Sequence, residues 1–239
     1  MANTLFLRLE GPMQSWGDHG QWAVRDSRLE PTKSGIVGLV ACAWGINADD
    51  ELRQLSRQIR IGVRCDRPGK PLEDYQTIGG GYEKPMLLQA DGYLKKIPNS
   101  DKPHIEQTWR TYIHDASFLV AVRADAALIE ILAEVIQNPC WPVYLGRKSC
   151  LPDFPLFAGI GGFASLEDAL CTWGNPSWAQ KSVQAVIECL PYEPGAEMRR
   201  DELVVSSCMQ FAPRYARTIA VTAHVPPEEI YALPVPSNS

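Results

Sequence analysis

A short loop bounded by two glycines follows the first predicted strand and collects several groups that suit ligand binding. The segment 11–17 reads GPMQSWG. Glycine allows backbone N–H groups to turn towards a phosphate. Gln14 and Ser15 add neutral hydrogen-bonding groups, and Trp16 offers a flat face on which a nucleobase stacks. The alternative is a tight turn in which Trp16 folds into the core.

The segment 31–35, PTKSG, opens a predicted helix and forms a second candidate anion site. A helix N-terminus carries free N–H groups and partial positive charge, and Lys33 adds a full charge. Gly35 and Gly38 each weaken the helix by about 1 kcal/mol relative to alanine, which makes sense if another group approaches its start closely. The spacing of a P-loop is absent. An ordinary capped helix start is the alternative.

Two further segments carry cations. Residues 145–150, LGRKSC, place Arg147 and Lys148 after a glycine, where they suit phosphate contacts, although a solvated basic turn fits as well. Trp109 and Arg110 lie where a long loop rejoins a predicted strand. Neighbouring strand residues face opposite ways, so one side chain can anchor the loop while the other reaches a nucleic acid.

Catalytic signals are weak, and we predict no catalytic residue. The motifs G-x-S-x-G and G-x-G-x-x-G are absent. A metal-independent ribonuclease needs a base and an acid, and the candidates are Tyr112 with His114 or Lys102 with His104. Each pair is adjacent only in sequence, and a structural histidine is the alternative.

Cysteine usage and charge set further bounds. The seven cysteines are scattered and form no C-x-x-C pair, and the four histidines do not cluster, so we expect no metal, no cofactor and no disulfide framework. The net charge of −5 argues against a free nucleic-acid binder, unless the basic residues gather in one groove. No membrane span and no secretory signal are expected, and a cytoplasmic location follows.

Hydrophobic periodicity predicts an α+β protein. Strands are expected at 4–9, 59–65, 108–113 and 117–123, and helices at 34–44, 49–57 and 125–137. Apart from the short helix at 49–57, this order is close to a ferredoxin-like arrangement. The glycine- and proline-rich stretch at about 78–107 is too long for an ordinary connection and predicts a protruding hairpin. We therefore expect a domain at 1–150 with this insertion and a smaller, mostly β subdomain with a tail at 151–239.

The segments LFLRLEGPMQSWG and PTKSGIVGL together resemble the N-terminal signature of the CasD family, the type I-E branch of the Cascade 5′-handle-binding (RAMP) proteins of CRISPR systems. The resemblance continues, in one order, at 74–77, 107–118 and 144–150, with a weaker echo at 210–214. The stretch 78–107 is longer than this family predicts, and the C-terminal third matches poorly.

The resemblance implies an RRM-like, ferredoxin-type domain with a protruding thumb. It implies a non-catalytic Cascade subunit that binds the 5′ handle of the crRNA, with the thumb folding over the RNA near the next backbone subunit. It also implies contact with the large subunit, and with target DNA only through the complex. The type I-C relatives cut the guide precursor with a Tyr/Lys/His set, so a metal-independent endoribonuclease is the alternative, although the matched segments follow the type I-E pattern.

The same resemblance implies the residues that contact RNA. They are Gln14, Ser15, Trp16, Lys33, Ser34, Arg110, Arg147 and Lys148. Within this set we expect the backbone and polar side chains at Gln14 and Ser15 to contact the RNA, while Trp16 holds the loop in shape.

Overall fold

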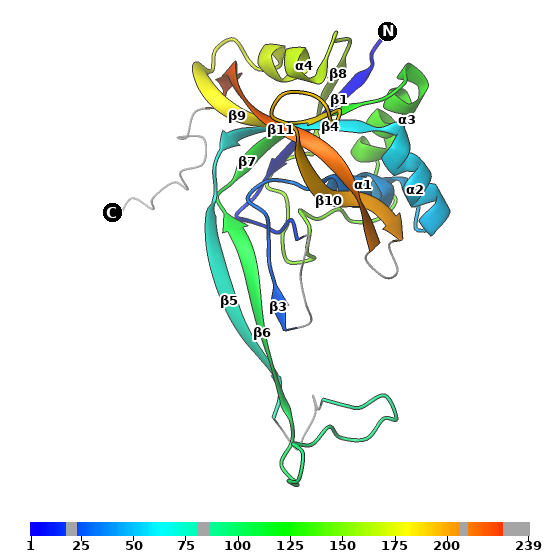
Figure 1. Ribbon diagram of the computed structural model, residues 1–239, viewed down its shortest axis with the longest axis vertical. Coiled ribbons are helices and arrows are strands. Elements are labelled where there is room, and N and C mark those ends of the chain that lie inside the picture. The colour runs from blue at the N-terminus through cyan, green and yellow to red at the C-terminus, as the bar shows by residue number, and fades with distance from the viewer. Residues whose placement is uncertain (18–22, 81–86, 206–209, 227–239) are drawn as a thin grey trace, which may run out of the picture.

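The computed structural model describes residues 1–17, 23–80, 87–205 and 210–226, which form a mixed α/β structure with antiparallel sheets (Figure 1). The helices are α1 (Lys33–Trp44), α2 (Asp49–Gln58), α3 (Ala126–Gln137) and α4 (Leu166–Thr172). The strands are β1 (Thr4–Glu10), β2 (Met13–Gln14), β3 (Val24–Arg25), β4 (Arg60–Arg67), β5 (Lys70–Gly79), β6 (Ile105–His114), β7 (Ser117–Arg123), β8 (Phe157–Gly161), β9 (Ala179–Cys189), β10 (Glu197–Val205) and β11 (Gln210–Val225).

One seven-stranded sheet organises the body of the molecule. Its strand order is β10-β11-β9-β4-β7-β1-β8, and every neighbouring pair is antiparallel. Side chains alternate between its two faces, so on β1 Leu5 and Leu7 join the core beneath α1 and α3, while Phe6 joins a second core beneath α4. Both faces of the central strands are therefore buried.

A second sheet is built around a long hairpin. Strands β5 and β6 pair antiparallel from Lys70 opposite His114 to Gly79 opposite Ile105, and the hairpin projects from the body (Figure 1). Its connection runs through residues 80–104, inside the stretch expected to protrude. The predicted insertion omitted most of β5, whose residues are largely exposed on both faces and therefore lack an apolar alternation.

The C-terminal strands continue the main sheet across residue 150. Strand β8 pairs with β1, and β9 pairs with β4 through Gly62 opposite Ile187. The division into 1–150 and 151–239 stays a prediction, but the sheet is shared between the two parts. No helix in the described ranges is long and apolar enough to cross a membrane.

Candidate nucleic-acid interface

The loop after β1 is held in place by a buried glutamine. The Gln14 side chain is fully buried, its Nε2 donates to the carbonyls of Leu9 (3.2 Å) and Ala116 (2.9 Å), and its Oε1 accepts from Trp16 Nε1 (3.0 Å). Each of these bonds satisfies a polar group that burial would otherwise leave unpaired. The polar atoms of this side chain are already bonded within the protein, to β1, to the β6–β7 turn and to Trp16, and its contact with RNA stays a prediction.

Trp16 is part of the core, which was the alternative to a ligand-binding role in the sequence analysis. The indole is 1% exposed and packs on the first turn of α1, where a Cβ added to Gly35 would come within 2.8 Å of its Cε3 atom. The group that approaches the helix start closely is therefore this tryptophan and not a ligand. The packing agrees with the expected role of Trp16 in shaping the loop, and stacking of an RNA base on its ring stays a prediction.

Backbone contacts join the first loop to the basic turn at 145–150. Ser15 N donates to Leu145 O at 3.0 Å, and Gly146, at φ +99°, leaves no room for a side chain because a Cβ would lie 1.8 Å from Ser15 O. Ser15 itself is buried, and its Oγ lies 3.4 Å from Thr111 O on β6. Three segments that are distant in sequence thus meet at the base of the hairpin.

Lys33 lies in a carboxylate cluster and not on the surface. Its side chain is 3% exposed, and Nζ lies 2.7 Å from Glu202 and 3.2 Å from Glu188, both on the C-terminal strands. A buried ammonium bonded to two carboxylates would lose strong partners on leaving them for a phosphate. Lys33 therefore has a structural role here, and its contact with RNA stays a prediction.

The N-terminus of α1 already holds an internal anion. Lys33 N donates to Asp201 Oδ2 at 2.9 Å, and Thr32 Oγ1 accepts from Gly35 N at 3.2 Å. Asp201 is in turn paired with Arg214 through bonds of 2.6 and 2.8 Å. The predicted phosphate site is occupied by this aspartate, and Ser34 at the helix start is half-buried, so part of its surface stays open.

Arg147 fastens the basic turn to the hairpin. Its Nη1 donates to Thr111 O at 3.3 Å, its Nη2 donates to Arg25 O at 3.1 Å, and its guanidinium lies 4.7 Å from the centroid of the Tyr112 ring. These contacts leave it half-buried, whereas the neighbouring Lys148 is exposed. Arg147 therefore positions the turn, and Lys148 is open to a polyanion.

The hydroxyl of Tyr112 lies among cationic and polar groups. Burial alone would raise the pKa of Tyr112, but hydrogen bonds from Ser149, Arg147 and Arg110, with the Arg147 charge, bring that pKa below its ordinary value. Arg110 Nε is buried and has no hydrogen-bond partner among the residues that the structure describes. We call the group Arg110, Tyr112, Arg147, Lys148 and Ser149 the hairpin-base cluster, and it can hold an anionic oxygen.

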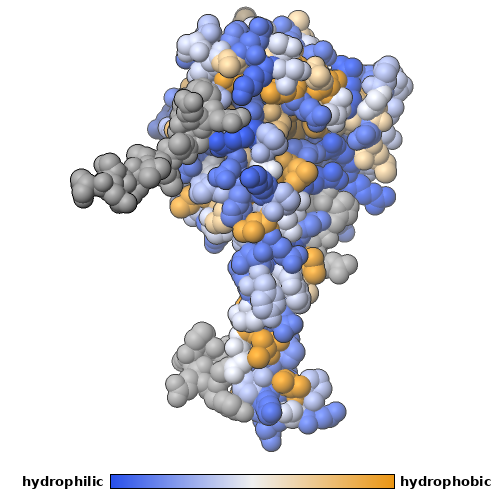
Figure 2. Space-filling view, turned by 90° about the vertical axis from the view of Figure 1, so that its left-hand side faces the viewer, coloured by the Kyte–Doolittle hydropathy of each residue, from blue (hydrophilic) through white to orange (hydrophobic). Residues whose placement is uncertain are grey.

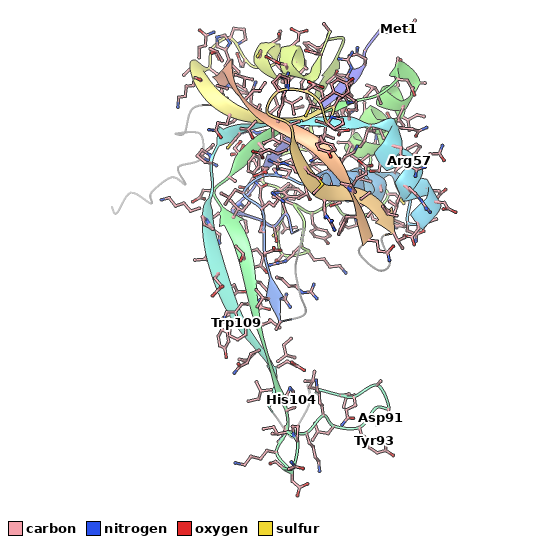
Figure 3. All side chains as sticks on the ribbon, in the orientation of Figure 1. Met1, Arg57, Asp91, Tyr93, His104 and Trp109 are labelled. Atoms are coloured by element: carbon pink, nitrogen blue, oxygen red, sulfur yellow. The ribbon has the colours of Figure 1, made fainter. Side chains whose placement is uncertain are left out.

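The outer part of the hairpin carries aromatic and apolar side chains. Tyr75 and Trp109 are register partners with ring centroids 5.4 Å apart. Figure 3 shows Trp109 partway along the hairpin and His104, Asp91 and Tyr93 at its far end. Figure 2 shows hydrophobic surface on this narrow part of the molecule. Exposed apolar residues continue along the whole hairpin, from Leu72 at its base, opposite Tyr112, to the far end: Leu72, Tyr75, Ile78, Leu88, Tyr93, Ile97 and Ile105.

The candidate ribonuclease pairs differ in their surroundings. Tyr112 and His114 lie two residues apart on β6 and so face the same side, and His114 Nε2 has no hydrogen-bond partner in the described ranges. His104 lies 3.4 Å from Glu106 near the far end of the hairpin, away from the hairpin-base cluster, and neighbouring Lys102 is exposed. Only the first pair therefore adjoins the cluster.

No cluster of three metal-ligating side chains occurs among the described residues, and the six cysteines described there are free thiols. Cys208 lies outside the described ranges. The sequence could not have revealed the Asp201 cap or the role of Thr111, because these partners are far along the chain. Tyr112 was visible only as a member of a weak catalytic pair.

Comparisons with known proteins cover nearly the whole chain. The family model for CRISPR-associated protein (Cas_Cas5) matches residues 4–217. The CRISPR system Cascade subunit CasD of Escherichia coli (strain K12) is 30% identical over 247 aligned positions, which cover 98% of this chain and 96% of that protein.

Solved structures agree with this relationship. A chain of a CRISPR RNA-guided surveillance complex superposes with a TM-score of 0.73 at 30% identity, covering 92% of this chain and 90% of its own length. A structure described as a crystal structure of Cas protein gives a TM-score of 0.68, also at 30% identity, with 93% and 97% covered. The match runs from the first strand into the last, across the hairpin-base cluster, and the chain therefore belongs to the Cas5 family of CRISPR-associated proteins.

Proposed function

We propose that this chain is a non-catalytic subunit of a Cascade-type CRISPR surveillance complex and binds the 5′ handle of the crRNA. The observation that carries the proposal is the full-length match to a Cascade subunit and to a chain of an RNA-guided surveillance complex. The hairpin-base cluster supports it, because cations and a tyrosine hydroxyl meet there on a rigid support, as phosphate recognition requires.

The residues divide into contacting and supporting roles. Lys148 and Arg110 supply charge to the RNA backbone, and Ser34 adds a hydroxyl beside the helix start. Gln14, Ser15, Trp16 and Lys33 act indirectly, by fixing the loop and helix on which the contacting groups stand, and Arg147 joins the basic turn to β6.

The hairpin extends this function to partners. Its exposed apolar residues, from Leu72 to Ile105, form a surface that suits a neighbouring backbone subunit, and we propose that it closes over the RNA there as a thumb. In this arrangement the chain also contacts the large subunit of the complex. It meets target DNA only through the assembled complex. We also propose that the protein acts in the cytoplasm.

We further infer that β1, α1, β4, β7, α3 and β8 form a ferredoxin-like unit. The chain order, with α2 added after α1, and the sheet order β4-β7-β1-β8 support this inference. On this view β9, β10 and β11 are the smaller C-terminal part, attached through the β4 edge, with the domain boundary near residue 150.

RNA binding by the purified chain and by the reconstituted complex tests the function. The double variant Lys148→Gln, Arg110→Gln should bind handle RNA at least about tenfold more weakly, because each charged contact to a phosphate contributes on the order of 1 kcal/mol or more. Arg53→Gln with Arg57→Gln, on α2, is the charge-matched control. Equal affinity in both double variants would contradict the proposal.

A metal-independent endoribonuclease is the alternative function. The observation in its favour is that Tyr112, whose pKa is lowered, lies on the same face of β6 as His114. Incubation with precursor RNA in EDTA separates the two functions. Cleavage at one site in the precursor repeat that disappears in Tyr112→Phe or His114→Ala would establish the enzyme. Intact precursor, retained on the protein, is the outcome expected from a binding subunit.

A further inference from the structure

A cavity of about 310 Å³ opens on the face of the main sheet that carries α4. Besides the buried Phe118, four half-buried aromatic side chains from the segments 154–157 and 173–178 line it. They are Phe154, Phe157, Trp173 and Trp178. The volume lies at the lower end of the range for small-molecule sites, so the cavity suits one flat ring system and not a stretch of chain.

The polar groups of the cavity form balanced pairs. Arg64 is fully buried and bonds Asp66 at 2.6 and 3.1 Å, and Arg8 bonds Glu10 at 2.8 Å. Burial raises the pKa of Asp66 even though the Arg64 bonds lower it, as expected for a carboxylate kept from water. Charges that are matched within the protein favour a neutral ligand over a phosphate.

Arg8 is the most exposed of the charged side chains that line the cavity, with Arg64 and Asp66 almost fully buried. Its guanidinium lies 4.0 Å from the centroid of the Phe154 ring, and its side chain is 25% exposed. Aromatic rings and guanidinium planes are the surfaces on which proteins stack unstacked bases of single-stranded RNA.

The cavity is close to the hairpin-base cluster along the chain. Phe154 follows Lys148 by six residues, so the wall of the cavity and the basic turn are at most about 21 Å apart. Arg8 precedes Gly11, which packs on the carbonyl of Leu151. An RNA strand whose phosphates lie on the basic turn can therefore place a nearby base at this cavity.

We propose that the cavity walled by Phe154 and Trp178, with Arg8 at its edge, is a pocket for a single unstacked nucleobase of the bound RNA. The inference rests on the proposed function and adds a base-binding site on the sheet face opposite α1. A base stacks between the aromatic walls, and Arg8 donates to its carbonyl or ring-nitrogen acceptors. The pocket fixes the register of the strand, whereas the hairpin-base cluster supplies affinity without regard to sequence.

The test uses the full chain and a short fluorescein-labelled single-stranded RNA copied from the 5′ end of the guide RNA that co-purifies with it. Abasic nucleotides are introduced one position at a time, and affinity is measured for the natural chain, Phe154→Leu, Trp178→Leu and the control Trp141→Leu. Trp141 is 41% exposed and lies outside the cavity. Leucine keeps apolar volume but removes the ring.

One abasic position is expected to weaken binding by the natural chain about five- to hundredfold, the range for loss of base–aromatic stacking. The same position should cost the Phe154 and Trp178 variants almost nothing, because their pocket has already lost its stacking wall. The Trp141 variant should behave as the natural chain does. This non-additivity separates loss of a shared contact from general damage to the fold.

Three results overturn the pocket. First, the pocket variants could keep full RNA affinity while Lys148→Gln and Arg110→Gln still weaken it. The proposed function would then hold, but the cavity would not be a base-binding site. Second, full RNA affinity in the pocket variants and in the Lys148 and Arg110 variants would contradict the proposed function as well. Pocket variants that bind RNA normally but no longer associate with the purified large subunit would assign the cavity to a protein side chain.

Discussion

Gly35 and Gly38 lie within one turn of each other on α1, but only one of them touches another side chain. A Cβ at Gly35 would meet Trp16 at 2.8 Å, whereas a Cβ at Gly38 meets nothing within 4 Å. We expect Gly38→Ala to stabilise the protein by about 0.5–1 kcal/mol through helix propensity. Gly35→Ala should instead destabilise it by about 1–3 kcal/mol, the usual range for overpacking.

Urea denaturation of the two variants measures both free energies of unfolding. The pair is internally controlled, because the substitution and the helix are the same. Equal stabilisation by both alanines would show that Trp16 does not hold the start of α1, and the shape of the loop would need another explanation.

Lys33 carries a second prediction, because its charge is needed by Glu188 and Glu202. Lys33→Met preserves much of the side-chain volume but leaves two largely buried carboxylates without their cation. Removing one partner of such a cluster costs about 3–5 kcal/mol. Restoring neutrality with Glu202→Gln in the same chain should recover part of this loss, and thermal unfolding of the single and double variants measures it.

The surroundings of Lys33 illustrate what sequence can and cannot predict at a single residue. The helix start at 32–35 was predicted, and Thr32 does cap it. The anion that faces it was invisible, because Asp201 lies 168 residues away from Lys33. A helix N-terminus attracts an anion in either case, and only tertiary structure decides whether that anion is a ligand or a side chain.

Among the elements, prediction succeeded where burial imposes a pattern. Helices α1 and α3 and strands β1 and β7 lie within a few residues of their expected positions, because each buries an apolar stripe or face. Strand β5 was missed because it is exposed on both faces and is stabilised by pairing with β6. Strand β8 was missed because Gly159 and Gly161 interrupt its sequence.

The connection between β5 and β6 gives a prediction at this scale. In the described parts of this connection, residues 80 and 87–104, the backbone bonds join its own residues, such as Gln89 to Tyr93 and Lys95 to Leu87, and none reaches the main sheet. Replacing residues 80–104 by Asn-Gly, a turn that suits a two-residue hairpin, should therefore change the melting temperature by no more than about 2 °C.

Assembly should respond differently from stability. The shortened chain loses the exposed apolar residues Leu88, Tyr93 and Ile97, so its proposed association with a neighbouring backbone subunit should weaken in size-exclusion or pull-down measurements. A second chain, in which glycine and serine replace residues 80–104 without changing their number, is the control. It keeps the length of the connection but lacks its apolar side chains. Normal assembly by both chains would remove the far end of the hairpin from the partner surface.

For the whole molecule, the net charge of −5 is a poor guide to the surface that meets RNA. Several acidic residues are used internally, with Asp201 bonded to Arg214 and Glu202 bonded to Lys33. Charge that is paired inside the molecule contributes little to the field outside it. The exposed Lys148 and the half-buried Arg110 and Arg147 still give the hairpin base a local positive character.

The salt dependence of RNA binding tests this separation of local from net charge. For a single strand, each phosphate neutralised by a cation adds about 0.7 to the magnitude of the slope of log K against log salt concentration. Neutralising Lys148 and Arg110 together should lower that slope by about 1.4. Neutralising Arg53 and Arg57 on α2 changes the net charge equally and should leave the slope as it was. Equal reductions in both double variants would mean that the RNA responds to the net charge and not to the hairpin base.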